Sequence, residues 1–156
     1  MSVEPIGPFI GAIMKTVDVA CEPERAFEVF TARMSRWWPL LKYSVGQAQA
    51  RTCGIEPRVG GSVWEERDDG ERSAWGTITV WEPPGRLAFT WHPGRDPETA
   101  QEVELRFHPI AGGTRVELEH RGWQKLGAQA ARTREGYDTG WDDVLLRHYV
   151  PACASA

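Results

Sequence analysis

Closely spaced tight-turn signals constrain this chain more than any other feature. Gly60-Gly61, Asp69-Gly70, Pro83-Pro84-Gly85 and Gly112-Gly113 divide its middle at short intervals. Short strands separated by such turns pair with their sequence neighbours, which gives an antiparallel meander. The candidate strands lie at residues 53–59, 62–67, 73–82, 86–92, 101–109 and 114–121.

Two of these segments alternate cleanly between apolar and polar residues, which indicates half-buried strands. In one, the apolar side chains are Val103, Leu105 and Phe107, with charged residues and His108 between them. In the next, Val116, Leu118 and His120 share a face opposite charged residues. We therefore expect one face of the sheet to be solvated and the other to be covered.

The segments on either side of the meander read as one strand and several helices. Residues 12–20 alternate as a first strand, and Pro23 then opens an amphipathic helix over residues 23–33. A second short helical turn contains Trp37 and Trp38 and stops before Pro39.

The C-terminal segment predicts the element that covers the sheet. No proline occurs from Gln129 to Val150, and one apolar stripe follows helical spacing. That stripe consists of Tyr137, Trp141, Val144, Leu145 and His148. Gly136 and Gly140 would each weaken a helix by about 0.5–1 kcal/mol, so either something approaches the backbone there or the helix begins near Asp138. The fold class is α+β, with a curved antiparallel sheet around a long C-terminal helix and two short helices after the first strand.

Composition excludes several functions. The 156 residues carry 22 acidic and 18 basic side chains without a dense basic run, so we expect no nucleic-acid partner. The acidic cluster Glu65, Glu66, Asp68, Asp69 and Glu71 is expected to form a solvated hairpin tip.

The cysteines and histidines show no metal-ligand spacing. The three cysteines have no close pairing pattern and no signal peptide precedes them, which favours a reducing cytoplasm. No CxxC or HxxxH spacing occurs, so we expect no metal, and no other cofactor motif is present. No apolar stretch is long enough for membrane insertion.

Six segments then resemble one family in order. They are VDVACEPERAFEVFT, SRWWP, GIEPRVGGSVWEE, WGTITVWEPPGRLAFTWHP, VELRFHPIAGGTRVELEHRGW and GWDDVLLRHY. The chain resembles the START/Bet v 1-like (SRPBCC) superfamily, and within it the branch named for activators of the heat-shock-protein-90 ATPase. The resemblance spans about residues 12–150 and implies a single helix-grip domain over residues 1–156. Members include lipid carriers, polyketide cyclases and chaperone activators, so the fold leaves the function open.

The eight tryptophans suggest either large core anchors or the aromatic lining of a cavity. We expect a pocket between the sheet and the C-terminal helix. One of Trp37 and Trp38 should be packed, and the other should be more exposed or lie at the pocket mouth. Val144 and His148 belong to the helix stripe but are not assigned to the pocket. The residues expected to line it are Trp37, Trp38, Phe89, Trp91, Val103, Leu105, Phe107, Val116, Leu118, His120, Tyr137 and Trp141.

Three functions remain open at this stage. The first is binding of a small hydrophobic or aromatic molecule, which such a lining suits. The second is a cyclase or dehydratase-like enzyme with His120 and Tyr137 as acid and base, which requires both to reach one substrate atom. The third is a protein-interaction module, although full chaperone activators carry an additional N-terminal domain that this sequence lacks. We expect a binding protein rather than an enzyme, and a homodimer is possible.

Overall fold

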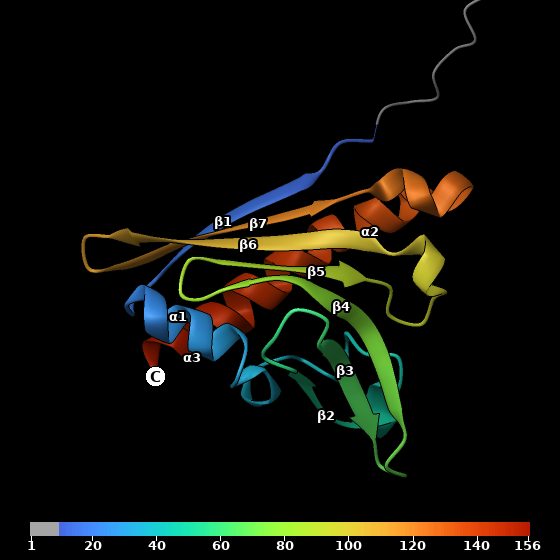
Figure 1. Cartoon of the computed structure of the whole chain (residues 1–156), viewed down its shortest axis with the longest axis horizontal. Coiled ribbons are helices and arrows are strands. Elements are labelled where there is room, and N and C mark those ends of the chain that lie inside the picture. Colours follow the sequence, from blue (N-terminus) through green and yellow to red (C-terminus); the bar gives the residue numbers. More distant parts are fainter. Residues whose placement is uncertain (1–9) are drawn as a thin grey trace, which may run out of the picture.

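The computed structural model describes residues 10–156, which form one curled antiparallel sheet and a long C-terminal helix (Figure 1). The sheet order is β1-β7-β6-β5-β4-β3-β2. This is the predicted helix-grip α+β fold; its expected domain range also includes residues 1–9, which lie outside the described residues. The strands are β1 (Ile13–Val19), β2 (Ala50–Ile55), β3 (Ser62–Arg67), β4 (Arg72–Glu82), β5 (Arg86–Trp91), β6 (Gln101–Ile110) and β7 (Gly113–Arg121).

The turn signals place most strands within one or two residues of their expected positions, but β2 differs. It covers Ala50–Ile55 instead of residues 53–59, because the chain turns immediately afterwards. The Glu56 carboxylate accepts a hydrogen bond from the Ser62 amide at 2.9 Å, and Gly60 adopts a positive φ of 84°. These contacts replace strand pairing over residues 56–61.

The first helix is also shorter than its periodicity predicts. Helix α1 (Pro23–Phe30) ends before residue 33, and its C-cap residue Thr31 donates both its backbone N–H and its hydroxyl to the Phe27 carbonyl. A 3₁₀ turn (Met34–Arg36) follows and places both Trp37 and Trp38 in the interior. Neither indole is exposed, so that alternative of the expectation is wrong; Trp38 instead lines the cavity described below.

The C-terminal segment is helical but changes pitch, and Gly127 (φ 58°, ψ −128°) interrupts it before the long helix begins. A 3₁₀ segment (Trp123–Gln129) leads into α2 (Ala130–Asp142), a π-helical turn (Asp143–Tyr149) and α3 (Val150–Ala154). Gly136 lies inside α2, so the helix does not begin near Asp138. At the end of the π-helical turn Tyr149 is buried, whereas His148 is only partly buried.

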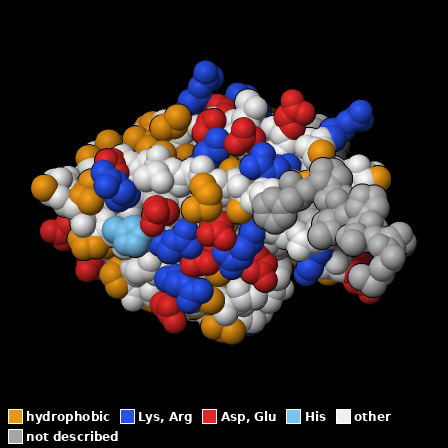
Figure 2. Space-filling view, turned by 90° about the horizontal axis from the view of Figure 1, so that it is seen from above, with side chains coloured by type: hydrophobic (Ala, Val, Ile, Leu, Met, Phe, Trp, Pro, Cys, Tyr) orange, Lys and Arg blue, Asp and Glu red, His pale blue; other side chains and the backbone are white. Residues whose placement is uncertain are grey.

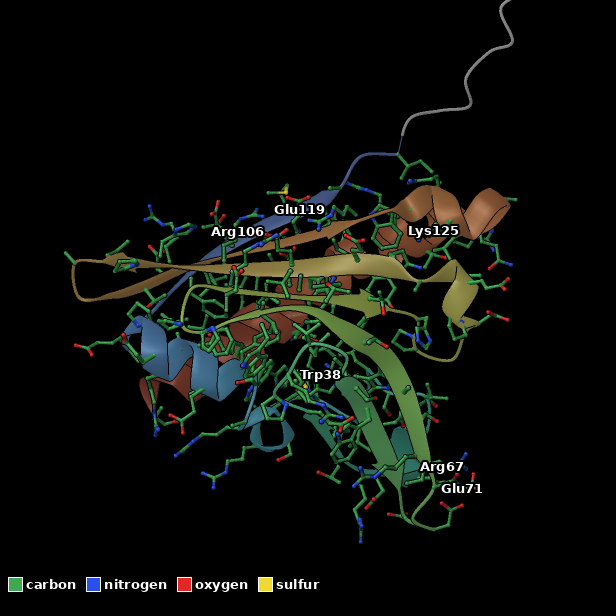
Figure 3. The ribbon with its side chains drawn as sticks, viewed as in Figure 1. Trp38, Arg67, Glu71, Arg106, Glu119 and Lys125 are labelled. Carbon is green, nitrogen blue, oxygen red and sulfur yellow. The ribbon has the colours of Figure 1, made fainter. Side chains whose placement is uncertain are left out.

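The concave face of the sheet is packed solid against α1 and the C-terminal helix. Its central side chains come from β5, β6 and β7, and each is at most 4 % exposed. The opposite face carries a lattice of alternating charges, visible as interleaved acidic and basic side chains in Figure 2. At its centre, Glu104 receives hydrogen bonds or ion pairs from Arg86, Arg106 and Arg121. Arg106 and Glu119 point away from the helix (Figure 3).

Candidate functional site

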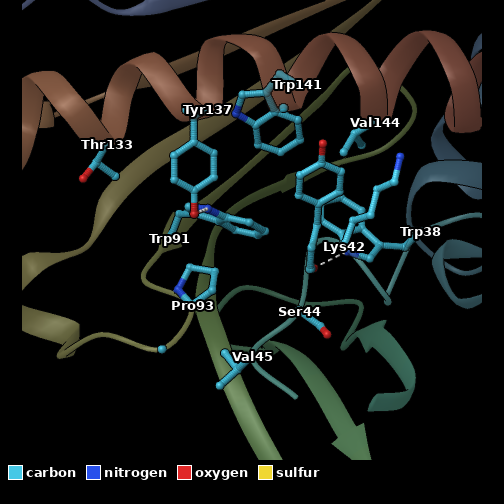
Figure 4. Close-up of a pocket in the computed structure, with 14 residues that line it drawn as sticks. Trp38, Lys42, Ser44, Val45, Trp91, Pro93, Thr133, Tyr137, Trp141 and Val144 are labelled. Atoms are coloured by element: carbon cyan, nitrogen blue, oxygen red, sulfur yellow. Dashed lines mark hydrogen bonds between the residues drawn. The ribbon is translucent and has the colours of Figure 1, made fainter. Parts of the chain in front are cut away.

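A cavity of about 390 Å³ lies between α2, the end of β5 and the segment that follows Trp38 (Figure 4). Its volume falls within the range of small-molecule sites. Three indoles and two phenols form most of its wall. The lining residues are Trp38, Lys42, Tyr43, Ser44, Val45, Trp91, Pro93, Gly94, Thr133, Gly136, Tyr137, Gly140, Trp141 and Val144.

Three tryptophans from distant parts of the chain form a triangle at the base of this cavity. The ring centroids of Trp38, Trp91 and Trp141 lie 5.8–6.0 Å apart in every pair. The rings are tilted or edge-to-face rather than stacked, which is the favourable arrangement for aromatic neighbours. Each indole is buried, so the triangle is a rigid apolar floor.

The two glycines of α2 have different surroundings. A methyl group at Gly140 would stand 3.5 Å from the Tyr43 ring, in ordinary contact, so the phenol lies directly over the helix backbone. A methyl group at Gly136 would meet nothing within 4 Å and would project into the cavity. Both glycines therefore leave space along the helix, at one position for Tyr43 and at the other for the cavity.

Tyr137 presents a hydroxyl whose oxygen is already engaged. The indole N–H of Trp91 donates to it at 3.0 Å. Burial raises the pKa of the Tyr137 phenol, and the hydrogen bond from Trp91 only partly offsets this, so the phenol keeps its proton at neutral pH. Because the oxygen accepts from Trp91, the O–H bond remains able to donate elsewhere.

The Tyr43 hydroxyl, in contrast to that of Tyr137, acts as a hydrogen-bond donor to the protein. Its hydroxyl donates to Asp143 Oδ2 at 3.0 Å, and Lys42 Nζ lies 3.5 Å from the same oxygen. Burial raises the pKa of Asp143, but the hydrogen bond from Tyr43 and the charge of Lys42 outweigh it and lower the pKa overall. The carboxylate is thus ionised and accepts the phenolic proton, while burial and Asp143 raise the pKa of Tyr43.

The segment that closes the cavity is fixed by a buried carboxylate. Glu65, on β3, is fully buried and accepts the backbone amides of Val45 and Gly46 at 2.6 and 2.9 Å. It also accepts the indole N–H of Trp75 at 2.6 Å. The prediction of a solvated hairpin tip is therefore wrong for Glu65, because strand alternation turns its side chain inward to meet these three donors.

His120 lies behind the indole floor and does not line the cavity. Its ring is fully buried, and Trp141 Nε1 donates to its Nδ1 at 3.0 Å. The other ring nitrogen, Nε2, lies 3.2 Å from Gln101 Oε1, and Trp123 stacks on the ring with centroids 4.1 Å apart. Burial lowers the pKa of His120 to about 3, so the ring is neutral and its hydrogen bonds are satisfied within the core.

The remaining expected pocket residues divide between two regions. Trp38, Trp91, Tyr137 and Trp141 line the cavity, together with Val144. Trp37 packs instead between Phe30 and Tyr149, and its indole donates to the Val29 carbonyl at 2.7 Å. The others are buried in the solid core between sheet and helices: Phe89, Val103, Leu105, Phe107, Val116 and Leu118.

Sequence reasoning missed the second wall of the cavity. Lys42, Tyr43, Ser44 and Val45 belong to an irregular segment without periodicity, so no pattern assigns them a face. The one local signal that this segment packs against the rest of the protein is an aromatic residue, Tyr43, four positions after Pro39. The sequence also did not identify Asp143 as a site residue, because its partner Tyr43 lies one hundred residues away.

Among residues 10–156, no cluster of three or more histidine, cysteine or acidic side chains could hold a metal ion. In that same range, no helix has the length and hydropathy required to span a bilayer. The three cysteines are free thiols.

The site and fold can now be compared with known proteins. Residues 20–148 match the family model described as Activator of Hsp90 ATPase homolog 1-like protein. The chain belongs to this family. AHSA1-like proteins form part of the SRPBCC/Bet v 1-like superfamily, as the six sequence segments predict. No curated protein gives a significant match.

Solved structures of AHSA1-like shape extend over nearly the whole chain. Protein NE0264 from Nitrosomonas europaea superposes with a TM-score of 0.66 at 16% identity, covering 91% of this chain and 93% of its own. An AHSA1-like protein from Aeromonas hydrophila gives 0.58 at 20% identity, covering 90% and 92%. At these identities the likeness establishes the fold alone.

One solved structure is more similar in sequence. It is an anthrahydroquino-gamma-pyrone synthase, Txn09, complexed with SUM. Its identity to this chain is 37%, with a TM-score of 0.58, covering 83% of this chain and 88% of its own.

Proposed function

We propose that this chain binds a planar aromatic small molecule in the cavity between α2 and residues 38–45. The observation that carries the proposal is the indole triangle of Trp38, Trp91 and Trp141, which forms a rigid apolar floor beneath two phenolic hydroxyls. Flat rings gain both apolar burial and favourable aromatic contacts on such a surface.

The α2 side of the cavity supports the same ligand class. The absence of a side chain at Gly136 leaves the α2 backbone open to the cavity, whereas the Tyr43 ring covers Gly140. The polar groups are few and stand at the edges, which suits a molecule with an apolar face and a polar rim. Txn09, the similar synthase, is named for a polycyclic aromatic product, which agrees with this class.

The test is a binding titration monitored by tryptophan fluorescence. Since three indoles line the cavity, an aromatic ligand such as 2-hydroxyanthraquinone is expected to quench the emission saturably. Gly136→Leu fills the cavity from a position where nothing else lies within 4 Å, so the protein is expected to fold and to lose binding. Thr139→Leu, on the exposed side of the same helix, is the matched control and should bind normally.

Two outcomes would remove the proposal. The first is a wild-type protein that shows no saturable quenching with any of a panel of hydroxylated anthraquinones. The second is binding that Gly136→Leu leaves unchanged, which would place the ligand elsewhere on the molecule.

A cyclase-type reaction is the second candidate, favoured by the similarity to Txn09. The acid and base would then be cavity groups such as Tyr137 and the Tyr43–Asp143 pair, since His120 lies behind Trp141. The probe is a hydroxyanthraquinone with an ortho 1,3-diketone side chain, which closes to a γ-pyrone with loss of one water. Product formation above the rate without protein, abolished in Gly136→Leu, supports catalysis; an unchanged rate excludes this reaction.

A further inference from the structure

The two phenols of the cavity have opposite hydrogen-bonding roles toward the protein: Tyr43 donates and Tyr137 accepts. Each phenol has one O–H to donate and lone pairs with which to accept. At Tyr43 the O–H is used on Asp143 Oδ2, 3.0 Å away. At Tyr137 the oxygen is used by the Trp91 indole, 3.0 Å away, and within residues 10–156 no acceptor takes its O–H.

The partners leave no ambiguity about these directions. An indole nitrogen can only donate, so Tyr137 must accept from Trp91. An ionised carboxylate can only accept, so Tyr43 must donate to Asp143. Lys42, beside the same carboxylate, favours its ionised form. Neither phenol can reverse its role without breaking a hydrogen bond to a partly or fully buried group.

We propose that the cavity selects aromatic ligands that carry both a hydroxyl and a ring carbonyl, with Tyr43 accepting the hydroxyl proton and Tyr137 donating to the carbonyl oxygen. This inference rests on the proposed aromatic-ligand function and adds the ligand's polar pattern to it. A hydroxyquinone gives both phenols a ligand partner, whereas a molecule with only one of these groups gives a partner to one phenol and a hydrocarbon to neither.

Unpaired polar groups are what makes the pattern selective. A phenol that is desolvated by the ligand and finds no partner loses its water without replacement. The indole floor cannot compensate, since its own N–H groups are already donated to Tyr137, to His120 and to the Tyr43 carbonyl. The two hydroxyls are therefore the polar groups that decide between flat ligands of equal size.

The experiment crosses three probes with two variants. The probes are 2-hydroxyanthraquinone, its methyl ether, which lacks the donor, and 2-hydroxyanthracene, which lacks the carbonyl. Tyr137→Phe is expected to weaken binding of the two carbonyl-bearing probes by about 3- to 10-fold and to leave 2-hydroxyanthracene unchanged. Tyr43→Phe is expected to weaken the two hydroxyl-bearing probes by a similar factor and to leave the methyl ether unchanged.

The control is Tyr149→Phe, which removes a buried phenol outside the cavity, hydrogen-bonded to the Ala26 carbonyl at 2.7 Å. It should lower stability while leaving all three dissociation constants unchanged. Equal weakening of all probes by each cavity variant, or the reversed pattern, overturns the assignment while the aromatic-ligand function stands. Failure of every probe to bind the wild-type protein removes both.

Discussion

The indole N–H of Trp141 points at Nδ1 of His120, 3.0 Å away. Because Nδ1 accepts this hydrogen bond, the ring proton resides on Nε2, which faces the Gln101 side-chain oxygen at 3.2 Å. His120, which the sequence suggested as an acid or base, is thus a neutral side chain that supports Trp141 in the cavity floor.

The first prediction concerns pH. The pKa of His120 is about 3 in the folded protein and near 6.5 in the unfolded chain, so the unfolded chain binds more protons between these values. The free energy of unfolding should therefore fall as pH falls through this window, by up to about 1.4 kcal/mol per pH unit. In His120→Gln this contribution is absent, and urea titrations at pH 7 and pH 4.5 should show a smaller difference than in the wild type. Parallel pH profiles for the two proteins would contradict the assignment, since the carboxylates titrate alike in both.

The second prediction concerns Glu65, which satisfies the amides of Val45 and Gly46 and the indole of Trp75. Glu65→Gln presents an NH₂ group to these donors, and we expect a loss of about 1–3 kcal/mol of unfolding free energy together with weaker ligand binding. Glu66→Gln on the same strand is the control, because its ion pairs with Arg51 and Arg72 lie at the surface and contribute less than about 1 kcal/mol. Equal stability of the two variants would show that the buried carboxylate does not fix the cavity wall.

The third prediction concerns Gly76, at the bulge where β4 bends. A Cβ there would stand 1.7 Å from the Thr90 carbonyl oxygen, which is backbone and cannot move aside. We expect Gly76→Ala to destabilise the protein by several kcal/mol, on the order of the largest single-residue effects, or to prevent folding. Gly85→Ala, whose new methyl group would have its nearest neighbour 3.9 Å away, should change the melting temperature little. Thermal melts followed by circular dichroism decide the comparison, and a Gly76→Ala protein as stable as wild type would show that the bulge is flexible.

The fold was predictable because turn residues and alternation are local signals. Asp69-Gly70 and Gly112-Gly113 mark hairpins whose strands then follow from their neighbours, and both turns occur with Gly70 and Gly112 at positive φ. The helix stripe likewise identified Tyr137 and Trp141 as inward-facing residues.

The site was only half predictable because its second wall has no periodicity. Tyr43 contacts Asp143, one hundred residues away, and Glu65 on β3 contacts Val45 in the irregular segment, so no local sequence pattern indicates either contact. Alternation correctly turned Val103 and Leu105 inward, but it could not distinguish a filled core from an open cavity. That distinction depends on side-chain volumes summed over elements that are far apart in sequence.

Because of the π-helical turn at Asp143–Tyr149, the parts of the C-terminal helix before and after it present their side chains in different directions. One inserted residue rotates everything beyond it by about 100° relative to an unbroken helix. Tyr137 and Trp141 before the turn are thus aligned on the cavity, while Tyr149 beyond it is aligned on α1, where its hydroxyl bonds the Ala26 carbonyl. The turn therefore separates a half of the helix that lines the cavity from a half that is anchored on α1.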